Sequence, residues 1–323
     1  MRVNRLALCP VAAALFLAAC QAPAPLDNTY KACDTNNKVV YTANFDEANK
    51  DSAYPVVIDL YQNKKPQFVT TLNKDEVLTD TDTFVTDISS PKLYAFKAEK
   101  PNGYGVIILP GGGYFGSAMQ HEGFDVATWF NKQGFSAFVL KYRTPNKVDQ
   151  IPLEDVNTAA DLIVSMADEF GLDPSKIGVF GSSAGGHLAA TYTAYATQQG
   201  LPAFSILLYP VITFDDEIAS ISDSKHNLVG YPKPGSELEL KYSLEKQVKP
   251  TTAKTFIALN ADDDTPPEHS IRYFRSLLAN KVNATMHIYP NGGHGFGFRE
   301  NFKYHDRFMS ELKNWLDNEV IGK

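Results

Sequence analysis

The sequence predicts an α/β fold in which one mostly parallel sheet is covered by helices on both faces. The first observation is a rhythm: from residue 104 onward, short apolar runs alternate with longer amphipathic segments over about 200 residues. The second is composition, because 323 residues, 44% of them hydrophobic and 21% charged, are enough for one large core.

The apolar runs predict strands and the amphipathic segments predict helices. Strands are expected at residues 104–109, 135–142, 177–180, 203–209, 255–260 and 284–289. Helices are expected at residues 116–133, 153–170, 184–197, 268–280 and 303–318. Shorter runs upstream predict antiparallel strands at the edge of the same sheet, at residues 54–60, 68–72 and 92–98.

Residues 51–323 are predicted to form a single domain, interrupted by an insertion around residues 212–252. The insertion is polar, contains Pro232, Pro234 and Gly235, and falls between two predicted strands. A long loop at such a place is more often functional than accidental, so we expect it to lie over the ends of the sheet.

The N-terminus does not belong to the predicted fold. Two arginines precede an apolar run at residues 6–19, which is shorter than the ~20 residues that usually span a membrane. The run ends in Leu17-Ala-Ala-Cys20, which resembles the lipobox of bacterial lipoproteins, whose cysteine is lipidated. The resemblance implies a signal peptide at residues 1–19, lipid on Cys20, and a tether and irregular segment at residues 20–50. A secretory signal with a chance cysteine is the alternative.

Such an N-terminus implies a lipid-anchored protein of the bacterial cell envelope, at the outer membrane or periplasmic face rather than in the cytoplasm. Cys9 would leave with the signal and Cys20 would carry lipid, so Cys33 has no partner for an intramolecular disulfide. The formal net charge of −7 argues against nucleic acid as a partner. The sequence does not indicate an oligomeric state.

A serine between two glycines is the candidate nucleophile. Gly181-Ser-Ser-Ala-Gly185 matches the pattern G-x-S-x-G and lies between a predicted strand and a predicted helix. On such a turn the hydroxyl of Ser183 would be exposed beside the positive end of the helix. Gly181 and Gly185 would be required because a Cβ there would collide with the neighbouring strand or helix. A glycine-rich turn without chemistry is the alternative.

A second glycine-rich turn is the candidate oxyanion site. Leu109-Pro-Gly-Gly-Gly-Tyr114 follows the first core strand, and its glycines let backbone N–H groups point toward one place. Gly112 and Gly113, with Ala184 after the serine, are therefore the candidate donors to a carbonyl oxygen that becomes negative. The alternative is a flexible glycine loop.

Three consecutive aspartates, Asp262, Asp263 and Asp264, follow a later predicted strand. A carboxylate in this place could orient a histidine and balance its charge. Counting back from the Pro-Pro pair that follows favours Asp263, and the two neighbours remain open. A calcium loop is disfavoured because three acids alone do not make a ligand set. A remote second choice is the pair after the preceding strand, Asp215 and Asp216.

His294 is the candidate base. It lies between glycines in Pro290-Asn-Gly-Gly-His-Gly-Phe-Gly297, directly after the last predicted strand, on a loop able to reach across the sheet ends. It also completes the chain order serine, aspartate, histidine. His187 is expected to be packed or hydrogen-bonded, and the remaining histidines lack a comparable setting: His121, His226, His269, His287 and His305.

Several segments of the chain look like those of a known family. They are residues 109–114, Glu122-Gly123, Leu140-Lys-Tyr-Arg143, residues 181–188, Asn227-Leu-Val-Gly230 and residues 288–294. Over most of residues 90–320 the chain resembles the α/β-hydrolase superfamily. More closely, it resembles the small esterases described as acetyl xylan esterase or feruloyl esterase, a group with xylanase B-like members. One departure is Pro266, which stands where the family usually has valine in Asp-x-x-Val-Pro. Because of this departure, the choice among the three aspartates stays open.

The resemblance implies an α/β-hydrolase fold and a serine esterase that needs no metal or organic cofactor. Ser183 would attack the ester, His294 would act as base, and Asp263 would hold the imidazole. The implied substrates are acetyl or feruloyl esters on plant-type polysaccharides or their oligosaccharides, with Tyr114 and the insertion shaping the pocket. The alternatives are a peptidase or amide hydrolase of the same fold, and a catalytically inactive sugar-binding lipoprotein.

Overall fold

The computed structural model describes most of the chain from residue 55 onward. The described ranges are residues 30–31, 40–41, 55–62, 64–72, 76–79, 84–198, 200, 202–215, 217 and 223–323. The signal peptide and the lipid site predicted at residues 1–20 lie outside them, as does Asp216. No helix in these ranges is both long and apolar enough to cross a bilayer.

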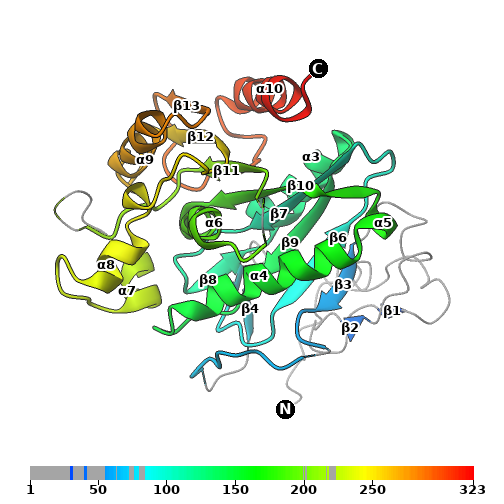
Figure 1. Cartoon of the computed structure of the whole chain (residues 1–323), viewed down its shortest axis with the longest axis horizontal. Coiled ribbons are helices and arrows are strands. Elements are labelled where there is room, and N and C mark those ends of the chain that lie inside the picture. The colour runs from blue at the N-terminus through cyan, green and yellow to red at the C-terminus, as the bar shows by residue number, and fades with distance from the viewer. Residues whose placement is uncertain are drawn as a thin grey trace, which may run out of the picture.

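A central eight-stranded sheet forms the middle layer of the structure (Figure 1). Across the sheet, its strands are β13 (Ala284–Tyr289), β12 (Lys254–Asn260), β11 (Phe204–Leu208), β10 (Leu172–Ser182), β7 (Gly103–Leu109), β9 (Ser136–Lys141), β6 (Lys92–Phe96) and β3 (Val56–Asp59). Neighbouring strands from β13 to β9 run parallel, whereas β6 and β3 are antiparallel at one edge. Every residue of β9 and β11 is buried, as expected for parallel strands covered on both faces.

Helices cover both faces of this sheet. They are α3 (Asp125–Lys132), α4 (Gln150–Ser165), α5 (Ala167–Phe170), α6 (Ser183–Tyr195), α9 (Glu268–Ala279) and α10 (His305–Trp315), which continues into η4 (Leu316–Ile321). On β10, the ring of Phe180 packs on Phe130 of α3, whereas the next residue, Gly181, faces α6. Because successive strand residues point to opposite faces, α3 and α6 lie on opposite sides of the sheet.

The core strands and most helices are therefore those predicted from the apolar pattern, with ends shifted by a few residues. The helix predicted at residues 116–133 is wrong in its first half. Gly116–Ala118 forms the short strand β8, followed by the π-helix η2 (Gln120–Phe124) before α3 begins. β8 pairs with β5 (Phe84–Thr86), which pairs in turn with β4 (Val77–Thr79). This pairing is close, because a Cβ on Gly116 would lie 2.6 Å from the Val85 carbonyl oxygen.

The strand predicted at residues 68–72 is also wrong. Its backbone donors bind side chains instead of a neighbouring strand: the Phe68 N–H donates to Glu154 and the Leu72 N–H to Thr70 Oγ1. An apolar run without a ladder partner does not form a strand, however strand-like its residues are.

The region predicted as an insertion contains helices of its own. They are α7 (Asp223–Val229), α8 (Glu237–Tyr242) and the 3-10 turn η3 (Leu244–Lys246), which packs against α6 and α9. A ring nitrogen of His187 on α6 donates to the carbonyl oxygen of Tyr242 at 2.9 Å, so the region is fastened to the helix that follows Ser183. The two-residue strands β1 (Tyr30–Lys31) and β2 (Val40–Tyr41) pair antiparallel upstream.

Candidate active site

Ser183 stands at the corner where β10 ends and α6 begins. Its φ is +53°, a left-handed conformation that non-glycine residues seldom adopt and that is typical of a sharp strand-to-helix turn. The predicted need for flanking glycines is confirmed. A Cβ on Gly181 would lie 2.2 Å from the Gly185 carbonyl oxygen, and one on Gly185 would lie 2.0 Å from that of Leu109. Only glycine allows this close approach of three backbone segments.

Ser183, His294 and Asp263 form one hydrogen-bonded chain. The Ser183 Oγ lies 2.8 Å from His294 Nε2, and His294 Nδ1 lies 2.8 Å and 3.0 Å from the two oxygens of Asp263. An ionised carboxylate only accepts, so Nδ1 carries the proton and Nε2 accepts from the serine hydroxyl. The Asp263 side chain is fully buried, whereas 30% of the His294 side chain is exposed. Such a chain can take the proton from a serine that attacks an electrophile.

The pKa of His294 is raised above its usual value of 6.5. Burial alone would lower it, but the hydrogen bond and the charge of Asp263 outweigh burial, and the charges of Glu122 and Asp264 act in the same direction. These groups favour the protonated imidazole, which is the form that appears once the serine proton has been transferred.

The other aspartates contact different partners. Asp262 accepts the backbone N–H groups of Gly292 and Gly293, at 3.2 Å and 2.9 Å, and these bonds lower its pKa. Asp264 is exposed and Asp215 forms an ion pair with Lys246 at 3.0 Å. Among the described candidates, only Asp263 lies against the imidazole of His294.

The glycine turn after β7 lies directly beside the serine. A Cβ on Gly111 would lie 2.9 Å from the Ser183 Cβ. Gly112 has a φ of +138°, where a Cβ would come within 2.3 Å of the Gly116 carbonyl oxygen, and Gly113 has a φ of +61°. Ala184 lies in the first turn of α6, where N–H groups have no acceptor within the helix. These backbone groups are therefore placed where they could donate to an oxygen bound at Ser183.

Two residues near this site were not assigned a role from the sequence. Glu122 is 3% exposed, and its carboxylate accepts the Gly111 N–H at 2.7 Å and the Tyr209 hydroxyl at 2.7 Å. The same hydroxyl accepts the N–H of Gly297, at 2.8 Å, and the Tyr209 ring packs edge-on against His294. Glu122 and Tyr209 thus connect the glycine turn to the histidine loop. In the sequence, Glu122-Gly123 contributes to the family resemblance but indicates no role for Glu122.

Tyr114, the predicted substrate contact, is almost fully buried. It is only 1% exposed, and its hydroxyl donates to His187 Nδ1 at 2.9 Å. His187 is fully buried, stacks on Phe214, and has a pKa that burial lowers to about 3, so it stays neutral. The expectation that His187 is packed and hydrogen-bonded is confirmed. Its contacts fix the Tyr114 ring, which forms part of the wall of a cavity.

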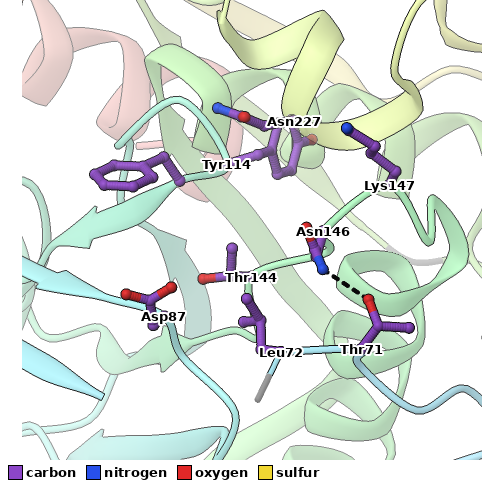
Figure 2. A pocket seen from close by; sticks show the side chains of 9 residues that line it. Thr71, Leu72, Asp87, Tyr114, Thr144, Asn146, Lys147 and Asn227 are labelled. Atoms are coloured by element: carbon purple, nitrogen blue, oxygen red, sulfur yellow. Dashed lines mark hydrogen bonds between the residues drawn. The ribbon is translucent and has the colours of Figure 1, made fainter. Parts of the chain in front are cut away.

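That cavity, of about 410 Å³, opens beside the glycine turn (Figure 2). Side chains from five stretches of chain line it: Thr71, Leu72, Asp87, Tyr114, Phe115, Thr144, Asn146, Lys147 and Asn227. Asn227 connects it to the turn, because its amide donates to the Gly113 carbonyl oxygen at 2.9 Å. Within the described ranges, no group of three or more His, Cys, Asp or Glu side chains is arranged to hold a metal ion.

Sequence comparisons link the chain to enzymes that act on esters and on xylan. The family model described as BD-FAE matches residues 92–229. The acetylxylan esterase of Xylanibacter ruminicola is 33% identical over 237 residues, which are 72% of this chain and 49% of that protein. Endo-1,4-beta-xylanase B of Butyrivibrio fibrisolvens is 33% identical over 206 residues, 59% of this chain and 32% of that protein. The chain spans half or less of the length of these two relatives.

A solved structure shows the same architecture along nearly its whole length. The acetyl ester-xyloside bifunctional hydrolase of Caldicellulosiruptor lactoaceticus superposes with a TM-score of 0.67 at 29% identity, covering 82% of this chain and 96% of that one. The mostly parallel sheet, the helices on both faces and the strand-to-helix turn at Ser183 agree with this similarity. The chain therefore has the α/β-hydrolase fold.

Proposed function

We propose that this protein is a serine esterase of the acetyl xylan esterase and feruloyl esterase family, which removes acetyl groups from xylan-type polysaccharides or their oligosaccharides. The observation that carries the proposal is the bonded chain from Ser183 through His294 to Asp263, set beside a glycine turn. The similarity to an acetylxylan esterase, an endo-1,4-beta-xylanase and an acetyl ester-xyloside hydrolase supports the ester and the xylan parts of the proposal.

The proposed reaction has two steps. In the first, Ser183 Oγ attacks the ester carbonyl carbon while His294 Nε2 takes the hydroxyl proton, and Asp263 stabilises the imidazolium. The carbonyl oxygen becomes negative and accepts hydrogen bonds from the N–H groups of Gly112, Gly113 and Ala184. The C–O bond then breaks, and the imidazolium gives its proton to the departing sugar oxygen, which leaves as a hydroxyl.

In the second step a water molecule replaces the sugar. His294 takes a proton from this water, whose oxygen attacks the carbonyl carbon of the acyl group on Ser183. Collapse of the second tetrahedral species breaks the bond to Ser183 Oγ, which recovers its proton from the imidazolium. The acid leaves and the free serine is restored, so no metal or organic cofactor enters either step.

Covalent labelling tests the nucleophile directly. An organophosphonate should add to Ser183, and peptide mass spectrometry should find the adduct there and not on the adjacent Ser182. An adduct on Ser182, or on neither serine, contradicts the assignment. Release of acid from acetyl, longer acyl and feruloyl esters, compared at equal enzyme concentration, tests the substrate class. Hydrolysis of peptide amides in preference to all of these esters would favour a peptidase instead.

We also propose that the protein is anchored in the bacterial cell envelope by a lipid on Cys20, which lies outside the described residues. The support is the lipobox-like segment Leu17-Ala-Ala-Cys20 after a short apolar run. The variant Cys20→Ser should lack the lipid and should leave the membrane fraction. If the variant fractionates with membranes as the parent does, the anchor lies elsewhere.

A further inference from the structure

The cavity beside the glycine turn is distinct from the position of the serine but adjoins it. Ser183 and His294 are not among its lining residues. Tyr114 and Phe115 line it, and they directly follow Gly113 in the chain. Consecutive Cα atoms are ~3.8 Å apart, so the Cα of Tyr114 lies within about 11 Å of that of Gly111, the residue that nearly touches Ser183. A molecule with its ester carbon at Ser183 can therefore extend into the cavity.

The backbone around this cavity is unusually strained. Seven non-glycine residues have positive φ in the described part of the chain. Four of them line the cavity: Asp87 (+52°), Tyr114 (+56°), Asn146 (+45°) and Lys147 (+70°). Such conformations persist only where surrounding contacts enforce them, and they cluster at ligand sites. The clustering indicates that the shape of this cavity is built and is not a gap between loops.

The side chains of the cavity are suited to hydroxyl groups. Asn146 donates to Thr71 Oγ1 at 2.6 Å (Figure 2). Asn227 donates to Gly113 O at 2.9 Å, so both amides are fixed. A carboxamide has two N–H donors and an oxygen with two lone pairs, so one internal bond leaves further donors and acceptors for a ligand. The Asp87 carboxylate and the Lys147 ammonium add one acceptor group and one donor group from opposite sides (Figure 2).

One aromatic ring completes this set. Phe115 is 55% exposed although it is large and apolar, and it lines the same cavity. A pyranose has an apolar face of C–H bonds and a rim of hydroxyls that both donate and accept. A flat exposed ring beside several amide, hydroxyl and charged groups matches both features of such a molecule.

We propose that this cavity is the sugar subsite of the enzyme, which holds the pyranose units on the alcohol side of the ester. This inference rests on the proposed esterase function. Phe115 packs on the C–H face of a sugar ring, and the amides of Asn146 and Asn227 bond to its hydroxyls. The acyl side is a poor occupant: an acetyl group would leave most of about 410 Å³ empty, and a feruloyl ring, with one hydroxyl and one methoxy oxygen, would leave several polar side chains without partners.

Two substitutions test the subsite without disturbing the serine. Phe115→Ala removes an exposed ring, and Asn146→Gly removes an amide while tolerating the positive φ. The matched control is Leu278→Ala, which removes a side chain of similar exposure, 51%, on α9. Each protein is assayed for kcat/KM on an acetylated xylo-oligosaccharide, on ethyl acetate, whose alcohol is much smaller than a pyranose, and on methyl ferulate, whose large group is on the acyl side.

The kcat/KM on the sugar ester, divided by that on ethyl acetate, should fall about tenfold in each cavity variant, mainly because KM of the sugar ester rises. This ratio should not change in the control. An equal fall on both esters, or no fall on either, overturns the subsite. A larger fall on methyl ferulate than on the sugar ester would assign the cavity to the acyl group and also overturns it.

A binding measurement tests the subsite independently of the proposed esterase activity. Isothermal titration calorimetry with xylotriose, which carries no ester, should show binding to the parent protein and about tenfold weaker binding to each cavity variant. If the parent hydrolyses neither ester, the proposed function fails while this titration still decides the subsite. Equal binding by parent and variants, or no binding by the parent, overturns the subsite even if the enzyme is active.

Discussion

The carboxylate of Asp262 accepts the backbone N–H of Gly293 at 2.9 Å, one residue before the histidine that Asp263 contacts. Two neighbouring acids thus hold the same loop in different ways: Asp263 binds the imidazole of His294, and Asp262 binds the backbone that carries it. From the sequence, Asp262 and Asp264 are expected to be solvated loop acids of little consequence. Asp262 is exposed as expected, but it also accepts two backbone N–H groups of a loop rich in glycine, so we predict that its removal has a cost.

The first prediction concerns the choice among the aspartates. Asp263→Asn should lower kcat on a simple acetyl ester by roughly three to four orders of magnitude, as in serine proteases, because the amide favours the wrong imidazole tautomer. Asp264→Asn, at the exposed neighbour, is the control and should stay within about twofold of the parent. Full activity in Asp263→Asn would show that this residue is not needed for catalysis.

The second prediction concerns the loop backbone. Asp262→Ala removes the acceptor for the N–H groups of Gly292 and Gly293 and should lower kcat about tenfold, because small misplacements of a base are costly. Asp262→Asn keeps one carbonyl acceptor and should retain more activity than Asp262→Ala. If both variants equal the parent in a kcat measurement, the loop is held by other contacts.

The third prediction is a pH dependence. The proposed mechanism needs neutral His294, whose pKa burial lowers but Asp263 raises more strongly, so that it lies above 6.5. The acid limb of the kcat/KM profile should therefore have its midpoint above pH 6.5, with activity lost as pH falls through the raised pKa. A limb centred below this value in the parent enzyme would contradict the assignment of His294 as base.

The fourth prediction separates the charge of Glu122 from its hydrogen bond. Glu122→Gln removes a negative charge that helps to raise the pKa of His294, so the acid limb should move to lower pH. Tyr209→Phe breaks the same Glu122–Tyr209 bond but keeps the carboxylate, so it should lower kcat without that shift. Equal profiles for the two variants would mean that Glu122 acts only by positioning the glycine turn.

The fifth prediction concerns stability. In an exposed helix interior, replacing glycine by alanine stabilises by about 1 kcal/mol. Gly185→Ala should instead lower the free energy of unfolding by about 1–3 kcal/mol or more, because its Cβ would lie 2.0 Å from the Leu109 carbonyl oxygen. Gly235→Ala is the control. An alanine there would be strained by the φ of +72°, but no atom lies within 4 Å of the added Cβ. Denaturant unfolding of both variants checks the difference, and equal midpoints would contradict it.

Local patterns in the sequence were sufficient to predict the fold class and the serine turn. Apolar runs and helical spacing are properties of neighbouring residues, so the strands of the parallel sheet and the closing helix followed from them. The need for Gly181 and Gly185 also followed, since a sharp turn between strand and helix excludes a Cβ wherever it occurs. Patterns of this kind failed at Gly116, where pairing with a distant strand replaced the expected helix.

The tertiary structure alone decided which distant groups meet. The choice of Asp263 over its neighbours depends on a loop 31 residues further along the chain, and the bond between Tyr209 and Glu122 spans 87 residues. The burial of the Tyr114 hydroxyl against His187 and the cavity beside it depend equally on contacts between separate loops. Such contacts follow from the paths of the connections between strands. Those paths are set by packing of the whole core, which the spacing of residues along one segment does not record.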